Sequence, residues 1–141
     1  MARIKIDLPS AFTFTTQIPV RISDINYGGH LGNDAVLAML HEARLRFLQS
    51  YGYSELELAG KGLIMADVAI EYKGEGFHGD LLTIQVAAQD FNKYGFDVVY
   101  QIANQENRLI ALAKTGMVCF DYNTRKVSSL PAEVREKLAS V

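Results

Sequence analysis

The stretch RISDINYGGHLGNDAVLAMLHEARLRFLQSY, residues 21–51, joins a glycine-rich polar turn to a long helical pattern. From residue 33 onward, apolar residues recur at the spacing that places them on one side of a helix. This stripe consists of Val36, Met39, Leu40, Ala43 and Phe47. Asn33 is the predicted N-cap and Gly52 the predicted stop. We therefore expect one amphipathic helix over residues 33–51, with Arg44 on its opposite, polar side.

The turn before this helix gathers residue types that perform acid and base chemistry. Asp24, Asn26 and His30 supply a carboxylate, an amide and an imidazole, which can act as base, polar orienter and acid or donor. The glycines between them allow the backbone to approach a ligand closely. Asp and Asn in such turns also bond the nearby backbone, so the turn has a purely structural interpretation as well.

Strand signals lie on both sides of the helix. Residues 12–22 are rich in β-branched and aromatic residues and predict a first strand, and Pro19 places that strand at a sheet edge or at a bulge. Four further strands are predicted at residues 62–73, 80–92, 95–105 and 108–121. The breaks between these four are short enough for antiparallel neighbours. A short closing helix is predicted over residues 131–139, with a proline near its first turn.

Composition favours an ordinary globular protein. A chain of 141 residues can bury a core without disulfides, so we expect one domain over residues 1–141. A net charge of −2 gives no basic footprint for nucleic acid. The single cysteine, Cys119, lies in an apolar run, which predicts a buried thiol and no cysteine-based metal site. We find no signal peptide and no apolar segment of membrane-spanning length, so we expect a cytoplasmic protein without a membrane partner.

One long helix and several antiparallel strands predict an α+β fold in which the helix covers one face of the sheet. Two sets of residues then carry a resemblance. The first set is Arg21, Asp24, Gly29, His30, Asn33, Glu42, Ala43 and Arg44. The second runs from Ala66 to Gly74 and from Phe77 to Leu82. On these residues the chain resembles the hot-dog acyl-CoA thioesterases related to 4-hydroxybenzoyl-CoA thioesterase. The resemblance implies a five-stranded antiparallel sheet wrapped around one long central helix.

The resemblance also implies a catalytic set, which is Asp24, Asn26, His30 and Glu42. Many relatives have an acid where this chain has Asn26, and a neutral amide cannot act as base or nucleophile. Water activation is therefore assigned to Asp24 or Glu42, with Asn26 and His30 orienting the water or the leaving thiolate. Glu42 and Arg46 also stand four residues apart, so an ordinary helix ion pair is an alternative for Glu42.

Substrate binding is predicted at Gly28, Gly29, Asn33 and Tyr72. Backbone N–H groups near Gly29, close to the helix N-terminus, are the predicted donors to the thioester oxygen. No cofactor and no metal are implied, because coenzyme A belongs to the substrate. The acyl group stays open, as does the choice between coenzyme A and an acyl-carrier protein.

Two other functions stay open. Residues 24–30, Asp-Ile-Asn-Tyr-Gly-Gly-His, resemble the turn of hot-dog enoyl-CoA hydratases but are one residue longer. A noncatalytic acyl-CoA binding protein is the other alternative, because Asn26 occupies an acid's position. The resemblance further implies a homodimer or homotetramer with its active site at the dimer interface.

Overall fold

The computed structural model describes residues 3–139 and contains one antiparallel sheet, one long helix and a short C-terminal helix. The long strands are β1 (Phe14–Pro19), β2 (Gly62–Tyr72), β3 (Leu81–Gln89), β4 (Gly95–Ala103) and β5 (Leu109–Asp121). The two-residue strand β6 (Lys126–Val127) pairs with β5, and the helices are α1 (Asn33–Gln49) and α2 (Ala132–Leu138). A 3-10 turn, Ile22–Asp24, connects β1 to the glycine-rich turn.

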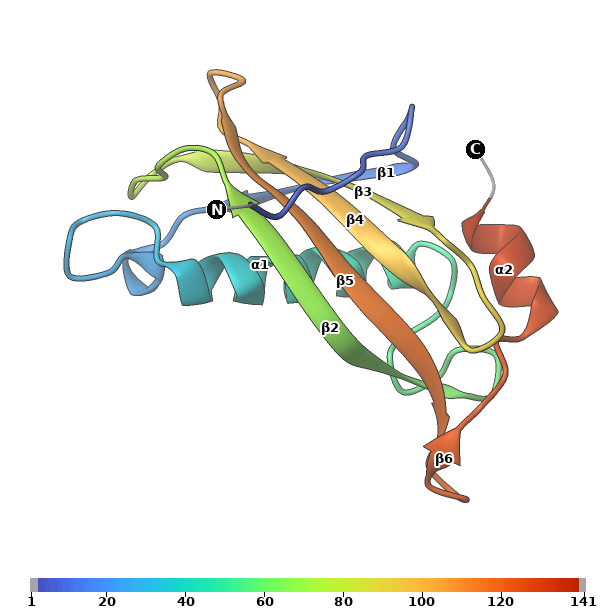
Figure 1. Cartoon of the computed structure of the whole chain (residues 1–141). Helices are drawn as coiled ribbons and strands as arrows, with labels where there is room; N and C mark the ends of the chain where they lie inside the picture. The colour runs from blue at the N-terminus through green and yellow to red at the C-terminus, as the bar shows by residue number, and fades with distance from the viewer. Residues whose placement is uncertain (1–2, 140–141) are drawn as a thin grey trace.

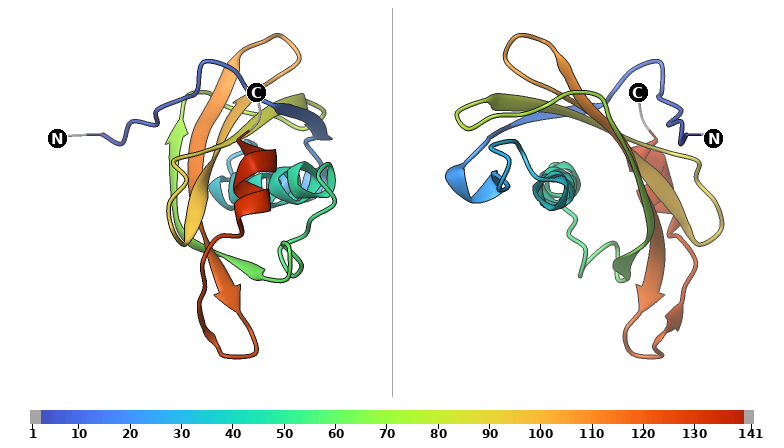
Figure 2. Two further views of the ribbon diagram at one scale, coloured as in Figure 1. Left: turned by 90° about the vertical axis from the view of Figure 1, so that its right-hand side faces the viewer. Right: turned by 60° about the vertical axis from the view of Figure 1, so that its left-hand side comes forward.

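The strands lie in the order β1-β3-β4-β5-β2, and every neighbouring pair is antiparallel. The sheet curves around α1, which is seen nearly end-on in the right-hand view of Figure 2. This is the predicted hot-dog architecture of five strands around a central helix (Figure 1), to which the structure adds β6. Pro19 ends β1, and β1 is an edge strand, as its missing donor predicts.

The core forms between α1 and the inner face of the sheet. All five residues of the predicted helix stripe are at most 4% exposed. They pack with large side chains of the sheet such as Tyr100, Phe96 and Ile84. Cys119 is fully buried as predicted, and burial raises the pKa of its thiol to about 11.

Three details of the helix prediction are wrong. The N-cap is Gly32 rather than Asn33, and α1 ends at Gln49 rather than at residue 51. The predicted stop is confirmed, because Gly52 has φ +82° and its N–H donates to the Gln49 carbonyl at 2.9 Å, while the Tyr53 N–H donates to the Leu48 carbonyl at 3.0 Å. Arg44 is only 4% exposed rather than on the polar side. Its Nε donates to Glu55 Oε1 at 2.9 Å and its Nη1 to the Tyr100 hydroxyl at 3.2 Å. These partners satisfy a guanidinium that the helix period alone would leave in solvent.

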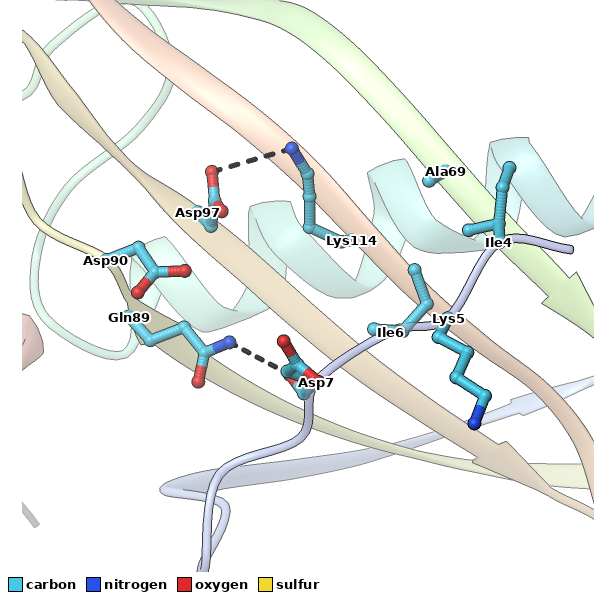
Figure 3. Close-up of a pocket in the computed structure, with 9 residues that line it drawn as sticks. All are labelled: Ile4, Lys5, Ile6, Asp7, Ala69, Gln89, Asp90, Asp97 and Lys114. Carbon is cyan, nitrogen blue, oxygen red and sulfur yellow. Dashed lines mark hydrogen bonds and ion pairs between the residues drawn. The ribbon is translucent and has the colours of Figure 1, made fainter. Parts of the chain in front are cut away.

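The N-terminal segment, which includes residues 4–7, crosses the outer face of the sheet, on the side away from α1 (Figures 2 and 3). It is held there because Ile6 N–H donates to Glu71 Oε2 at 2.8 Å and Gln89 Nε2 donates to the Asp7 carbonyl at 2.9 Å. Beneath it lies a cavity of about 180 Å³ that includes Asp97 and Lys114. Within the described residues, the N-terminal segment therefore covers part of the outer face of the sheet.

The closing segment forms α2 with Pro131 as its N-cap, which confirms the predicted helix. No helix within residues 3–139 is both long enough and apolar enough to cross a bilayer.

Candidate active site

The glycine-rich turn is organised by Asn26. Its side-chain oxygen accepts the N–H groups of Gly28 at 2.9 Å and His30 at 3.2 Å. Its main-chain carbonyl accepts the N–H of Gly29 at 3.1 Å, and its own N–H donates to the His30 carbonyl at 2.8 Å. The Asn26 amide thus shapes the turn, as the structural interpretation predicts. The three N–H groups that the sequence offers as oxyanion donors near Gly29 all have acceptors inside the turn in this structure.

The turn passes into α1 through Gly32, which lies against the Asp34 side chain. A Cβ at Gly32 would lie 2.6 Å from Asp34 Oδ1, so a larger residue there would require the Asp34 carboxylate to move. As the N-cap it has no side chain, and no side-chain hydrogen bond caps the helix. The first N–H groups of an α-helix have no acceptor within the helix, and its dipole places partial positive charge there. The N-terminus of α1 can therefore receive negative charge.

A cavity of about 280 Å³ lies beside this helix terminus, and we call it the turn cavity. It brings together four of the predicted residues, Asn26, His30, Asn33 and Tyr72. The other lining residues are Leu31, Val36, Gly74, Glu75, Gly76 and Ile110. Gly28 and Gly29 shape the turn but are not among these lining residues. Gly29 has φ +82°, a left-handed conformation that favours glycine.

Tyr72 reaches the turn cavity from the end of β2. Its hydroxyl donates to the Asn33 carbonyl at 3.4 Å. Partial burial, with a smaller effect from the Asp34 carboxylate, raises the pKa of Tyr72 above its usual value. The phenol is therefore protonated at neutral pH and can donate a hydrogen bond in the cavity.

Asp24 and Glu42 lie elsewhere, in a separate cavity of about 450 Å³ that we call the helix-side cavity. The Asp24 carboxylate accepts the Arg21 N–H at 2.8 Å, and Arg21 Nε lies 3.6 Å from the same oxygen. Glu42 Oε2 accepts from Arg46 Nε at 2.8 Å, which confirms the predicted helix ion pair. Within one chain, the structure thus divides the predicted catalytic set between two cavities.

The turn cavity also holds a carboxylate that sequence reasoning missed. Glu75 lies in the loop between β2 and β3, and its Oε2 is 3.4 Å from His30 Nδ1. The resemblance had singled out residues on both sides of this loop, up to Gly74 and from Phe77, but not Glu75. The two small glycines that flank it, Gly74 and Gly76, were the available signal. No group of three histidine, cysteine or acidic side chains in the described part of the chain is arranged to hold a metal ion.

Comparison with known proteins identifies the family. The model of the Thioesterase-like superfamily matches residues 20–138. The long-chain acyl-CoA thioesterase FadM of Escherichia coli strain K12 is 31% identical over 125 residues, which cover 87% of this chain and 95% of FadM.

Solved structures agree in fold. A 1,4-dihydroxy-2-naphthoyl-CoA thioesterase from Synechocystis has a TM-score of 0.81 at 24% identity, covering 91% of this chain and 96% of that one. The probable thioesterase YbaW from Escherichia coli has a TM-score of 0.73 at 26% identity, covering 89% and 96%. A Staphylococcus aureus protein solved in complex with CoA has a TM-score of 0.81 at 19% identity, covering 94% and 86%. The chain belongs to the thioesterase-like superfamily and is a thioester hydrolase with the hot-dog fold.

Proposed function

We propose that this enzyme hydrolyses acyl-CoA thioesters to the free acid and the thiol, and that the reaction takes place in the turn cavity. The observation that carries the proposal is the meeting of an uncapped helix N-terminus with His30 and Tyr72 in one cavity. The names of FadM and of the CoA-bound relative support coenzyme A as the carrier. The reaction needs no further cofactor, and the cytoplasmic location expected from the sequence is part of the proposal.

The N-terminus of α1 replaces the turn N–H groups as the proposed oxyanion donor. The N–H groups of Asn33 and Asp34 belong to its first turn, where intrahelical acceptors are lacking. A thioester carbonyl placed against them gains hydrogen bonds that strengthen as negative charge develops on its oxygen. The Tyr72 hydroxyl donates to the Asn33 carbonyl in the free enzyme, so it would have to exchange that hydrogen bond to donate to the same oxygen.

The size of the turn cavity limits what it holds. Pockets for drug-sized ligands measure about 300–1,000 Å³, whereas this one measures about 280 Å³. It accommodates the thioester and the atoms next to it. The acyl chain and the pantetheine arm extend beyond the cavity, against the surface or a second chain.

We further propose that the enzyme is a homodimer, or a homotetramer built from such dimers, paired along β2. This strand is the free edge of the sheet opposite β1 and is eleven residues long. It exposes Ile64, Met65 and Val68, an unusual load of apolar side chains for an edge that stays in water. Tyr72 also belongs to β2, so a partner paired there would lie next to the turn cavity.

The sequence-based assignment of water activation to Asp24 or Glu42 has a geometric consequence. Both residues line the helix-side cavity, so either can serve only a thioester carbonyl that lies there. A reaction in the turn cavity therefore predicts that Asp24→Asn and Glu42→Gln keep most of the rate of hydrolysis. A loss of about 100-fold or more in either variant, the usual range for loss of a general base, would instead place the reaction in the helix-side cavity, as the sequence-based assignment requires.

The experiment that tests the proposed function measures thiol release from a panel of acyl-CoA esters of graded chain length, including an aromatic ester. Hydrolysis by the wild-type protein supports it. Loss of enoyl absorbance without thiol release indicates a hydratase instead, and saturable binding without either reaction indicates an acyl-CoA binding protein. Parallel esters of an acyl-carrier protein decide between the two carriers.

A further inference from the structure

We propose that Glu75 is the positioning residue that makes His30 the base for water in the turn cavity. This inference rests on the proposed function and adds a residue and a role to it. Glu75 would thereby supply, from a different loop, the carboxylate that is missing at Asn26.

The first observation concerns the two ring nitrogens of His30. Nδ1 is buried and has no hydrogen-bond partner within hydrogen-bond geometry among residues 3–139. The acceptor near it is Glu75 Oε2 at 3.4 Å, at ion-pair distance. Hydrogen bonds between catalytic groups are commonly long in the free enzyme and shorten when substrate binds. The side chain as a whole is 39% exposed although Nδ1 is buried, and we assign Nε2 to the exposed part of the ring.

A carboxylate beside Nδ1 favours the neutral imidazole tautomer that carries its proton on Nδ1. When this contact shortens to a hydrogen bond, the Nδ1–H donates to Glu75, and Nε2 is left as the acceptor that can take a proton. The Phe77 ring packs against the imidazole with ring centroids 5.2 Å apart, which limits its rotation. His30 is therefore fixed with its basic nitrogen on the open side.

The second observation is that Glu75 is the one acidic residue among those that line the turn cavity. Asp24 and Glu42 line the other cavity and are held by Arg21 and Arg46. Asn26 has no basic group, and its oxygen already accepts two N–H groups.

The third observation is that the chain builds a direct connection between the two loops. Leu31 N–H, one residue after His30, donates to the carbonyl of Gly76 at 2.8 Å. The approach is so close that a Cβ on Gly76 would lie 2.9 Å from Leu31 Cβ. Glu75 is thus held beside His30 by the main chain on its C-terminal side.

The reaction balances with these groups alone. Water bonds through its oxygen to the thioester carbonyl carbon, and one of its protons goes to His30 Nε2 while Glu75 stabilises the imidazolium. The tetrahedral intermediate then expels the thiolate as the C–S bond breaks. The thiolate takes the proton from His30, which returns the neutral imidazole and leaves acid and thiol as products.

The test compares Glu75→Gln with a matched control, Glu106→Gln. The two side chains are 68% and 65% exposed, and both lie in loops between strands. Glu75→Gln is expected to lower kcat for a hydrolysed acyl-CoA by about 10- to 100-fold with KM changed by less than about twofold. Glu75→Asp is expected to recover part of the loss, and Glu106→Gln to match wild type. Equal melting temperatures for all variants show that folding is not the cause.

A second readout follows the imidazole itself. The ¹⁵N spectrum of the wild-type protein is expected to show His30 with its proton on Nδ1, and Glu75→Gln to shift the population toward Nε2–H. His30→Gln identifies the signal among the three histidines of the chain.

The outcomes separate the two proposals. A wild-type protein that hydrolyses acyl-CoA together with a fully active Glu75→Gln variant overturns the inference alone, as does an Nε2-protonated His30 in the wild type. A wild-type protein that releases no thiol from any ester overturns the proposed function and, with it, the catalytic role of Glu75.

Discussion

Among the single residues of the turn, Asn26 and His30 have different roles, one structural and one chemical. The Asn26 side-chain oxygen accepts the N–H groups of Gly28 and His30 and carries no charge. The imidazole next to it faces Glu75. An amide that holds the turn and a carboxylate that reaches it from another loop together replace one acid.

Two substitutions of Asn26 separate its hydrogen bonds within the turn from a direct part in the reaction. Asn26→Asp keeps an oxygen at the same place, so the turn persists and thiol release stays at or above the wild-type rate. Asn26→Ala removes two hydrogen bonds, each worth about 1 kcal/mol net, and is expected to lower both the free energy of unfolding and kcat. Denaturant unfolding and thiol release measure the two effects. Equal kcat for Asn26→Ala and wild type would show that the turn geometry does not matter for the reaction.

Cys119 gives a pH-dependent test of the core. Burial raises the pKa of its thiol to about 11, so the folded state keeps a proton that the unfolded chain loses near pH 9. The unfolded state binds fewer protons over this interval, and stability must fall as pH rises from about 9 to 11. Cys119→Ala lacks this titration. The free energy of unfolding of the wild-type protein should therefore fall relative to that of the variant over that interval. A difference that is constant with pH contradicts the account.

At the scale of elements, the pattern of residues predicted the helix stripe, the strands and the edge position of β1. These features follow from local spacing and from proline chemistry, both of which are visible in sequence. Arg44 was misplaced because its partners, Glu55 and Tyr100, come from a loop and from β4. Such long-range hydrogen bonds override helix periodicity and leave no local signal.

Long-range contacts also explain which residues of the candidate site could be predicted from sequence and which could not. Asn26, His30, Asn33 and Tyr72 could be predicted because the family pattern and the helix start mark them, and the structure gathers them in one cavity. Glu75 was missed because its nearness to His30 depends on the contact between two loops 45 positions apart in the chain, and the flanking glycines alone do not show which loop it meets. The placement of Asp24 and Glu42 in a different cavity depends on which way the turn and helix face, which residue spacing does not determine.

Gly76 tests the contact between the loops. Gly76→Ala would place a methyl group 2.9 Å from Leu31 Cβ, so the loop must move away from the turn. Because Glu75 moves with it, we expect kcat to fall toward that of Glu75→Gln. Gly76 is itself buried against the core residue Leu31, so the free energy of unfolding also falls, and kcat is compared under conditions in which both proteins are folded. Gly79→Ala is unsuitable as a control because Gly79 has φ +91°, and Glu106→Gln serves instead. Wild-type kcat in Gly76→Ala would contradict the positioning role of this loop.

At the scale of the whole molecule, the fold leaves two features that suit a second chain. One is the free β2 edge with its exposed apolar residues, and the other is a turn cavity too small to enclose a whole acyl-CoA. Pairing along β2 would satisfy the strand's outward backbone groups and would place more protein beside Tyr72. Both features have the same explanation if the working unit is a dimer or larger.

Light scattering is the corresponding test. We expect a mass of at least twice the 15.6 kDa of one chain. Val68→Lys adds charge to the β2 edge and should shift the protein toward monomer, with a matching fall in kcat/KM. A wild-type monomer at assay concentration with full activity would contradict a site that depends on two chains.

Thiol release by the wild-type protein and by His30→Gln shows whether thioester hydrolysis occurs at the turn before α1. We expect the wild-type protein to release thiol from at least one acyl-CoA in the panel, and the variant to do so at a rate lower by about 100-fold or more. Full activity in a folded His30→Gln protein, or no release from any ester by the wild type, would contradict it.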